Sequence, residues 1–404
     1  MGWAGGVDLI VYIANALSRN SSGKIYVLLS DNGNTFSEIY NPTKKDTRIS
    51  VSRKIKLNMG NFKHTHPDEL TQQLLNNLDP DIKIIFYKNT PEGLYHTARS
   101  RKIKVLLPLM TSLGRNFPIP WIGYIWDFQH RYLPDYFSNE DRLHRDKVFD
   151  STMRDAYSVL VNAKQVKIDI KKILSHEHDI SKVTALPFSP SISEDSLNDS
   201  TGKTRLDYKI PEKYFMISNQ FWEHKSHLIA IRALDELRKD PNLRNIHIVC
   251  TGKMEEPRNP TYIPSIIKEV KKRGLTKYIH FTGYIPKNDQ LIIMRGAIAV
   301  LQPTLYEGGP GGGASYSAVA LGIPVIASDI PINKELNKGE VAFFRAGSAS
   351  SLARVMKKEL FKQRKALTKR ELLTNSRHNE EELFSSIMEC IDTATDNYRH
   401  SQGG

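Results

Sequence analysis

The segment PTLYEGGPGGGASYSAVALGIPVIAS, residues 303–328, decides the fold class of this 404-residue chain. It follows the apolar, strand-like run Ala297–Gln302 and leads into a helix-like run, so the five glycines in positions 308–313 stand at a strand-to-helix turn. Glycine at such a turn permits positive φ and lets a ligand approach bare backbone N–H groups. The N-terminus of the following helix adds about half a positive elementary charge. The segment therefore predicts a turn that binds a phosphate or a developing oxyanion.

Strand-like and helix-like runs alternate on the N-terminal side of this turn. Tyr214–Ser218 and Ile246–Thr251 are strand-like, and His227–Arg238 and Tyr262–Arg273 have helical periodicity. The first half of the chain repeats the scheme, with strand-like runs such as Ile119–Ile125. This alternation predicts βαβ units and parallel sheets. We therefore expect an α/β fold of two doubly wound, Rossmann-like domains.

A polar stretch divides the chain into these two domains. Residues 188–211 are rich in Ser, Asp and Pro, a composition typical of a linker. We expect an N-terminal domain over residues 1–190, a linker over 191–211 and a C-terminal domain over 212–375. A final helix over 376–404 is expected to pack back on the N-terminal domain.

The start of the chain departs from this scheme. Gly5 and Gly6 stand before a helix that is expected to begin near Asp8, and they look like a first strand-to-helix turn. No strand-like run precedes them. We therefore expect the first strand of the N-terminal sheet to be missing.

Composition excludes several classes of protein. With 40% hydrophobic and 25% charged residues the chain is globular rather than disordered. It has no uncharged apolar run of about 18 residues, as a transmembrane helix would need, and no visible signal peptide. Cys250 and Cys390 alone cannot build a disulfide framework or a cysteine-based zinc site. These features predict a cytoplasmic protein.

The charge balance favours anionic partners. Lys and Arg number 57 against 44 Asp and Glu, a formal net charge of +13, which suits nucleic acid, an acidic membrane surface or phosphorylated small molecules. Residues 354–371 hold eight Lys or Arg and two Glu. Most such runs are solvated helix faces, and the alternative is a peripheral contact with the anionic inner face of a membrane. No nucleic-acid partner is expected, because aromatic residues are not interleaved with this run.

The glycine-rich segment resembles a known signature. With Tyr306-Glu307 before it and ALGIPVIAS over 320–328, it is similar to the donor-binding signature of retaining GT-B glycosyltransferases, in particular glycosyltransferase family 4. The resemblance implies that Glu307 hydrogen-bonds hydroxyls of the donor sugar and takes part in catalysis. It also implies that the donor lies against the backbone of Gly308, Gly309, Gly311, Gly312 and Gly313.

One residue of the family signature is absent. The family usually carries a second Glu that holds the ribose of the nucleotide. Counting forward from Glu307 puts Ser315 in its place, and counting back from Gly322 puts Ser317 there, because this loop is longer. A hydroxyl can bond a ribose hydroxyl, although more weakly than a carboxylate does. This departure leaves the identity of the nucleotide open.

The segment NQFWEHKSH, residues 219–227, is a second match. In the family this turn carries an Arg and a following Lys, both of which bind the donor diphosphate. Lys225 fits the Lys position, and Gln220 replaces the Arg. The alternative for Lys225 is a surface lysine near the start of a helix. His224 and His227 lie close enough to suggest a metal, but no third ligand is near and no metal is expected.

The segment WDFQHRYLPDYF, residues 126–137, is a third match. It resembles the family's segment in which a strand ends in Asp-x-x-His. The resemblance places His130 near the donor sugar and the acceptor, where it would position a hydroxyl or ease proton movement. The alternative is a histidine of the core, which is the commoner role for a lone His.

Three weaker matches complete the resemblance. Gly5 and Gly6 fit a turn that approaches the donor phosphate and the acceptor. Tyr284 and Ile285 fit a turn that lies against the nucleobase. Glu335, in the tail of the signature, is expected to cap a helix or pair structurally.

The resemblance implies a retaining, metal-independent hexosyltransferase of GT-B fold. It would move a sugar from a nucleotide diphosphate sugar to a saccharide or lipid-linked saccharide, with no further cofactor, in surface polysaccharide or lipopolysaccharide assembly. The alternative is a non-catalytic, basic GT-B-like binding or scaffold protein. That alternative is suggested by the charge of +13, the absent second Glu and Arg, and the missing first strand.

Overall fold

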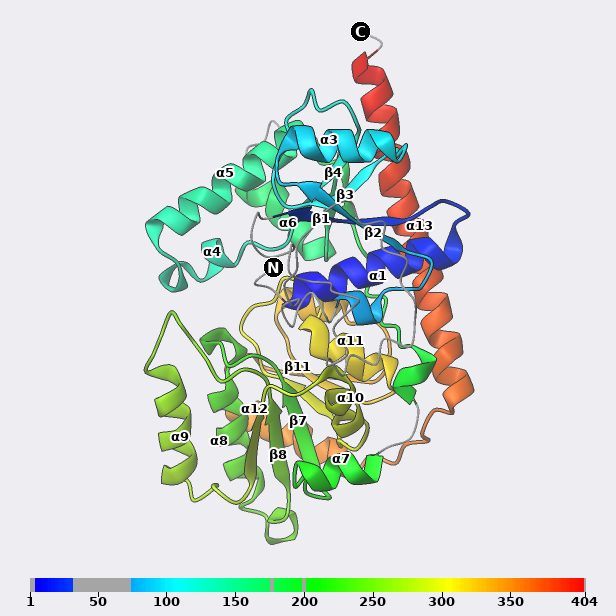
Figure 1. The fold of residues 1–404 in the computed structure, drawn as a ribbon. Helices are drawn as coiled ribbons and strands as arrows, with labels where there is room; N and C mark the ends of the chain where they lie inside the picture. The colour runs from blue at the N-terminus through cyan, green and yellow to red at the C-terminus, as the bar shows by residue number, and fades with distance from the viewer. Residues whose placement is uncertain (1–3, 32–73, 175–177, 198–200, 403–404) are drawn as a thin grey trace, which may run out of the picture.

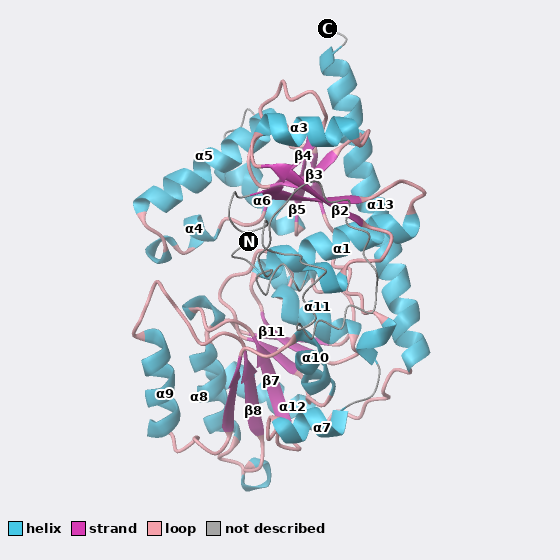
Figure 2. Cartoon of the chain, viewed as in Figure 1, coloured by secondary structure: helices cyan, strands magenta, loops and turns pink. Residues whose placement is uncertain are grey.

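The computed structural model describes residues 4–31, 74–174, 178–197 and 201–402, which form two bodies of parallel strands and flanking helices (Figures 1 and 2). The first half of the chain contains α1 (Ala4–Asn20), β1 (Tyr26–Asp31), β2 (Lys83–Lys88), α3 (Pro91–Ser100), β3 (Leu106–Leu109), β4 (Trp121–Ile125), α4 (Gln129–Tyr132), α5 (Asn139–Asp155), β5 (Ser158–Val161), α6 (Lys164–Ile173) and β6 (Val183–Ala185). The second half contains α7 (Thr201–Asp207), β7 (Tyr214–Ser218), α8 (His227–Leu237), β8 (His247–Thr251), α9 (Tyr262–Lys272), β9 (Ile279–Gly283), α10 (Lys287–Arg295), β10 (Val300–Gln302), α11 (Gly312–Ala320), β11 (Val325–Ser328), β12 (Val341–Phe344), α12 (Ala349–Leu360) and α13 (Lys369–Gln402).

The C-terminal domain is built on one six-stranded parallel sheet with the strand order β12-β11-β10-β7-β8-β9. Residues of α8, α9 and α12 form the core on one face of the sheet, and residues of α10 and α11 form it on the other. Because both faces are covered, β7, β10 and β11 are buried along their whole length, as their apolar sequences predict. The doubly wound arrangement expected from the sequence is confirmed here, and the glycine turn leads from the carboxyl end of β10 into α11.

The described strands of the N-terminal domain form two parallel sheets. Four strands have the order β3-β4-β5-β6, and β1 pairs with β2. The large, fully buried side chains of the core include Trp121 and Tyr124 from β4 and Phe149 from α5. The carboxyl ends of β4 and β5 therefore rest on a packed core that holds the loops after them in place.

Helix α1 begins at Ala4, so Gly5 and Gly6 lie inside its first turn. This corrects the expectation of a glycine turn before a helix that starts near Asp8. Glycine is a weak helix former, but burial of Val7, Ile13 and Leu17 stabilises the helix through tertiary packing. The expected absence of a strand before Gly5 concerns residues 1–3, which lie outside the described residues.

The segment expected as a linker, residues 191–211, contains a 3-10 turn, Glu194–Leu197, and helix α7. Helix α7 packs against α10 of the C-terminal domain. Just after α7, the Tyr208 hydroxyl donates a hydrogen bond of 2.9 Å to the Asp289 carboxylate on α10. The second part of this segment is thus a packed piece of the C-terminal domain rather than an extended connection.

Helix α13 returns the chain to the N-terminal domain (Figure 1). It starts at Lys369, earlier than the expected residue 376, and packs against α1, β4, β5 and β6. Leu383, Ile387 and Cys390 from this helix are part of the N-terminal core. Across the described ranges, neither α13 nor any other helix combines the length and the apolar character that a membrane span requires.

Candidate active site between the domains

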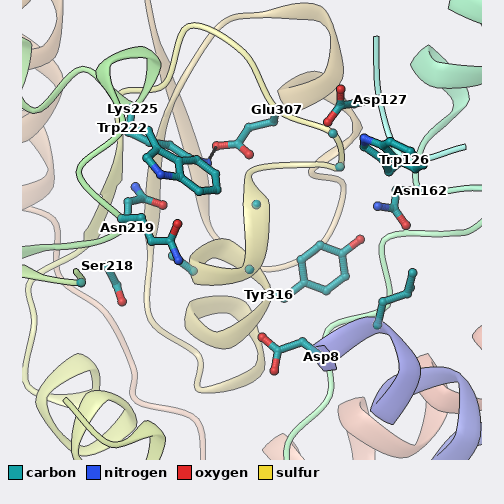
Figure 3. A pocket seen from close by; sticks show the side chains of 18 of the residues that line it. Asp8, Trp126, Asp127, Asn162, Ser218, Asn219, Trp222, Lys225, Glu307 and Tyr316 are labelled. Atoms are coloured by element: carbon teal, nitrogen blue, oxygen red, sulfur yellow. Dashed lines mark hydrogen bonds and ion pairs between the residues drawn. The ribbon is translucent and has the colours of Figure 1, made fainter. Parts of the chain in front are cut away.

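A cavity of about 380 Å³ lies where the two domains face each other (Figure 3). The side chains and turns that line it from the N-terminal domain include Asp8, Tyr12, Trp126, Asp127, Gln129 and Asn162. From the C-terminal domain they include Asn219, Gln220, Trp222, Lys225, Gly252, Tyr284, Lys287, Glu307 and Tyr316. Many of these residues follow the carboxyl ends of parallel strands, which is where ligands bind in doubly wound sheets.

A buried ion pair stands at the C-terminal side of the cavity. The Lys225 ammonium donates to Glu307 Oε1 over 2.5 Å, and both side chains are nearly inaccessible to solvent. Gln302 Nε2 donates to the same carboxylate oxygen over 2.7 Å, and Asn219 Nδ2 donates to Gln302 Oε1 over 2.6 Å. Lys225 and Gln302 both bond Glu307 Oε1, so among the described residues Glu307 Oε2 keeps its acceptor capacity for a ligand.

The glycine turn needs glycine at positions 308 and 312, because other atoms of the protein lie too close to leave room for a Cβ. A Cβ on Gly308 would lie 2.8 Å from the carbonyl oxygen of Trp126 in the opposite domain. Gly312 has a φ of +62°, and a Cβ there would lie 3.0 Å from Glu307 Oε2. The turn thus presses against the N-terminal domain and leaves the Glu307 carboxylate next to the N-terminus of α11. A carboxylate and a helix N-terminus side by side offer one acceptor and several N–H donors to the same ligand.

The two serines considered for the place of the absent Glu behave differently. Ser315 is fully buried and donates over 2.9 Å to the carbonyl of Gly311, so its hydroxyl is used inside its own helix. Ser317 is also buried, but its Oγ accepts a hydrogen bond of 3.1 Å from the ammonium of Lys287. Lys287 lines the cavity, and neither serine does.

The residues predicted for the site divide into two groups, according to whether they line the cavity. Those that line the cavity are Gln220, Lys225, Tyr284, Ile285, Glu307, Gly308, Gly309, Gly312 and Gly313. Those that do not line it are Gly5, Gly6, His130, Gly311, Ser315 and Ser317. Gly311 supports the turn indirectly, because its N–H donates to Asn333 Oδ1 over 3.0 Å.

His130 does not face the cavity in this structure. It lies in a cluster of Phe128, Phe137 and Phe149 and is completely inaccessible to solvent. Its Nε2 lies 2.9 Å from Asp146 Oδ1, and burial lowers its pKa. The position therefore departs from the expected role beside the sugar, because helix α4 carries the side chain back toward α5.

His224 and His227 are buried histidines, and His224 also lines the cavity. His227 stacks on Phe221 with ring centroids 4.1 Å apart. Burial lowers the pKa of His224 to about 2 and the pKa of His227 to about 3, so both rings are neutral at pH 7. Within the described ranges no group of three His, Cys, Asp or Glu side chains is placed to hold a metal ion.

Two polar contacts hold the domains together beside the cavity. The Tyr306 hydroxyl accepts a hydrogen bond of 2.9 Å from the N–H of Phe128. The Glu335 carboxylate accepts the N–H groups of Lys164 and Gln165 over 2.9 and 2.7 Å, which caps the N-terminus of α6 in the other domain. The structural capping role expected for Glu335 is confirmed. These contacts describe a closed arrangement of the two domains.

The second half of the chain carries the family relation. Residues 203–374, which include both the turn with Lys225 and the glycine turn with Glu307, match the family model described as Glycosyl transferases group 1. This match covers less than half of the chain. No curated relative matches the chain by sequence.

Solved structures resemble the C-terminal domain together with the N-terminal domain. Anabaena Alr3699/HepE in complex with UDP and glucose has a TM-score of 0.62 at 12% identity, over 97% of each chain. Sucrose-phosphate synthase from Thermosynechococcus elongatus has a TM-score of 0.56 at 16% identity, over 98% of this chain and 94% of that one. WaaG, a glycosyltransferase involved in lipopolysaccharide biosynthesis, has 0.52 at 14%, over 93% and 91%. These likenesses confirm the expected GT-B fold of two facing Rossmann-like domains.

Asp127, in the N-terminal domain, is one of the cavity residues that the sequence analysis did not single out. Its Oδ1 accepts from the N–H of Gln129 over 2.9 Å and from Arg145 over 3.3 Å, and burial raises its pKa. The available signal was its position two residues after the end of β4, at the carboxyl edge of the sheet. The carboxylate at this edge faces the glycine turn, since a Cβ on Gly308 would lie 3.2 Å from Asp127 Cβ.

Proposed function

We propose that the chain transfers a sugar from a nucleotide diphosphate sugar, with retention of anomeric configuration, to a saccharide or lipid-linked saccharide. The observation that carries this proposal is the Lys225–Glu307 ion pair, buried beside the N-terminus of α11 and open to the interdomain cavity. The group 1 family match over residues 203–374 supports the same reaction class.

The donor is placed with its diphosphate over the backbone amides of Gly312 and Gly313. These amides begin α11, whose dipole favours negative charge at that end. Lys225 lies on the same side and supplies a cation. Glu307 Oε2 is positioned to accept hydrogen bonds from hydroxyls of the transferred sugar, and Tyr284 and Ile285 offer an apolar surface to the base.

Bond breaking in this arrangement depends on stabilising the leaving diphosphate. The bond between the anomeric carbon and the phosphate oxygen breaks, and the acceptor hydroxyl oxygen forms a new bond to that carbon on the same face. The acceptor proton passes to the departing phosphate oxygen. Lys225 and the α11 amides stabilise the charge that develops, so we propose that neither a metal nor a further cofactor takes part. A rate that survives treatment with a chelator would support this.

Two further observations bear on where the acceptor binds and on where in the cell the protein acts. The N-terminal domain, with Asp127 and Asp8 at the cavity, is proposed to bind the acceptor. A cytoplasmic location at the inner face of the membrane is proposed, with the basic residues of 354–371 near anionic lipid. Assembly of a surface polysaccharide or lipopolysaccharide is the proposed context. Flotation with liposomes of increasing acidic lipid content tests the membrane contact.

The first experiment is thermal stabilisation of the purified chain by UDP, GDP, ADP and dTDP. UDP is the first to try, because HepE was solved with it. A nucleotide at about 100 times its dissociation constant adds roughly 2.7 kcal/mol to the stability of the form that binds it. We expect one nucleotide to stabilise the wild type and to have little effect on Lys225→Ala.

A matched control is Lys268→Ala, an exposed lysine on α9 that lies away from the cavity. This variant should respond to the nucleotide as the wild type does. If no nucleotide stabilises a wild-type chain that melts cooperatively, the donor site is disproved, and the non-catalytic scaffold alternative is favoured.

A further inference from the structure

Each of the two tryptophans that line the cavity has an arginine over its ring. The Arg145 guanidinium lies 5.5 Å from the ring centroid of Trp126, and the Arg258 guanidinium lies 5.7 Å from the ring centroid of Trp222. Trp126 comes from the N-terminal domain and Trp222 from the C-terminal domain, and Figure 3 shows them on opposite sides of the cavity with Glu307 between them. Distances below about 6 Å are in the range of cation–π attraction. Each arginine therefore holds one indole on its side of the cavity.

Phe137 joins the two arginines across the domain interface. Its ring centroid lies 4.6 Å from the Arg145 guanidinium of its own domain and 5.9 Å from the Arg258 guanidinium of the C-terminal domain. The ring is half-buried, and it lies outside the lining of the described cavity. Trp126, Arg145, Phe137, Arg258 and Trp222 thus form one continuous series of cation–π contacts, which we call the interdomain stack.

A carboxylate fixes each arginine of the interdomain stack. Asp127, which lines the cavity, accepts a hydrogen bond of 3.3 Å from Arg145. Glu256, whose side chain is only 1% exposed, accepts from Arg258 Nε over 2.9 Å. The same carboxylate accepts the N–H of Glu223 over 2.8 Å, in the 3-10 turn before α8 that supplies the cavity lysine. The stack is therefore tied to a cavity carboxylate in one domain and to the donor-side turn in the other.

The surroundings of the two indoles match a sugar ring. One face of a pyranose is formed by C–H groups, and an indole offers an apolar surface to such a face. Asp127, Asn162 and Glu307 line the same cavity and can exchange hydrogen bonds with the hydroxyls at the edge of the ring. Because the two indoles come from different domains, one ring can contact both only when their separation is fixed across the interface.

We propose that Phe137 is a positioning residue that holds Trp126 and Trp222 at the separation at which both contact a bound sugar ring. This inference rests on the proposed function, and it adds to the sugar site at Glu307 the interdomain stack that completes that site. A nucleotide without a sugar is held by Lys225 and the α11 amides of the C-terminal domain alone, so its affinity should not depend on Phe137. The affinity that the sugar adds should depend on it.

The test measures how much a sugar adds to nucleotide affinity. Calorimetry gives the dissociation constants of UDP, GDP, ADP and dTDP and of their glucose, galactose and mannose conjugates, for the full-length wild type and its Phe137 variants. Phe137→Leu keeps an apolar side chain but loses the aromatic face. We expect it to bind the nucleotide as the wild type does and the hexose conjugate about tenfold more weakly, which is the equivalent of two cation–π contacts. Phe137→Tyr keeps the ring and should bind both ligands as the wild type does.

The matched control is Phe361→Leu, at an exposed phenylalanine where α12 ends, which should bind both ligands as the wild type does. Phe137→Met replaces Phe137→Leu if the leucine variant does not melt cooperatively.

Three results would overturn the inference while the proposed function stands. They are a wild type to which no hexose adds affinity, a Phe137→Leu chain that binds the conjugate as tightly as the wild type, and equal weakening of nucleotide and conjugate in that variant. Equal losses in Phe137→Tyr and Phe137→Leu would also overturn it, because the ring face would then be irrelevant. Failure of every nucleotide to bind the wild type would overturn the proposed function and the inference together. The two kinds of failure are distinguishable, because only the first leaves measurable nucleotide binding.

Discussion

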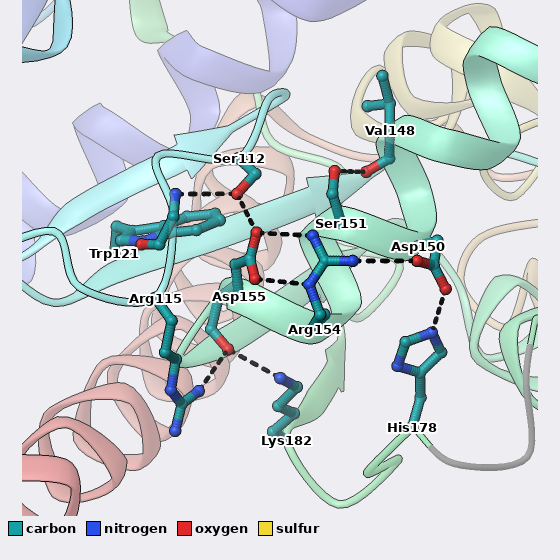
Figure 4. A network of polar contacts seen from close by, with 12 residues as sticks. Ser112, Arg115, Trp121, Val148, Asp150, Ser151, Arg154, Asp155, His178 and Lys182 are labelled. Atoms are coloured by element: carbon teal, nitrogen blue, oxygen red, sulfur yellow. Dashed lines mark hydrogen bonds and ion pairs between the residues drawn. The ribbon is translucent and has the colours of Figure 1, made fainter.

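Two polar clusters of the molecule differ in whether a carboxylate keeps an oxygen available to a ligand. At the cavity, Glu307 uses one oxygen for Lys225 and Gln302 and leaves the other beside the α11 N-terminus. At the end of α5, Asp155 accepts from Ser112 and from Arg154, which also contacts Asp150 (Figure 4). His178 completes the second cluster through Asp150 at 2.8 Å.

The difference teaches how to tell a binding cluster from a structural one. The α5 cluster satisfies its carboxylates by internal partners, and much of it is exposed, with 61% of the Arg154 side chain accessible. The cavity cluster is buried, and in it Glu307 Oε2 keeps its acceptor capacity for a ligand. Retaining a buried charge with unused hydrogen-bonding capacity is costly for stability, so such an arrangement indicates a ligand.

The largest effect is expected from Glu307→Ala. Removal of the carboxylate leaves Lys225 buried without its partner, which should lower the free energy of unfolding by about 3–5 kcal/mol. Sugar transfer should fall by at least about 100-fold, as for the loss of a transition-state contact. Urea denaturation and a product assay with the nucleotide sugar measure the two effects.

The double variant Lys225→Met with Glu307→Leu serves as the control. An apolar pair of similar volume should recover most of the stability and none of the activity. Transfer within tenfold of the wild type in Glu307→Ala would contradict the assignment of this cluster as the binding one.

The next effect concerns Lys182, in the structural region near the end of α5. Its ammonium donates to the Ala156 carbonyl over 2.8 Å, and burial lowers its pKa to about 8 (Figure 4). Between pH 8 and the ordinary pKa of 10.5, the unfolded chain binds more protons than the folded one. Stability therefore rises with pH across this window, by about 1–3 kcal/mol.

The measurement is the free energy of unfolding from pH 7 to 10.5, for the wild type and for Lys182→Met. Subtracting the two profiles removes the contribution of tyrosines and other lysines, which titrate in both chains. A difference that stays flat across the window would show that Lys182 is solvated rather than buried.

A smaller effect is expected from Glu335→Ala at the interdomain contact. The variant loses the cap on two N–H groups of α6, which should lower the free energy of unfolding by about 1–2 kcal/mol. The control is Glu340→Ala, whose carboxylate pairs with Lys362 and Arg364 at the surface and should change stability by about 0.5 kcal/mol or less. Equal effects of the two variants would argue against the cap.

The smallest effect is expected from Arg154→Ala. Its ion pairs with Asp150 and Asp155 are exposed and screened, so the free energy of unfolding should hardly change and the effect should be insensitive to nucleotide. Thermal melts with and without UDP measure both quantities. A loss of stability as large as that of Glu335→Ala would show that this cluster stabilises the fold rather than forming a solvated network.

The sequence is sufficient to locate a residue whose position follows from the order of strands and helices. Glu307 and Lys225 lie at strand-to-helix turns of a parallel sheet. The hydrophobic periodicity of the segments on either side shows where those turns are, without any knowledge of side-chain positions. It failed for His130, because the direction of that side chain depends on whether α4 packs against α5, which the local sequence does not encode.

The Lys287–Ser317 contact could not be predicted for a related reason. The two residues are 30 positions apart, on α10 and α11, and meet only because β10 places those helices side by side. Counting within the glycine segment left Ser315 and Ser317 as alternatives, and only their hydrogen bonds separate them. Asp127 was passed over since its neighbour His130 carried the stronger resemblance.

The position of α13 has a consequence for how the protein is made. Leu383, Ile387, Cys390 and Ala394 belong to the core of the N-terminal domain, although a ribosome adds them about 200 residues after β6. At about 5–20 residues per second, roughly 10–40 s separate synthesis of β6 from synthesis of these core residues. The C-terminal domain can close its six-stranded sheet in that interval. We therefore expect the second domain to fold first during synthesis, while the core of the first domain waits for α13.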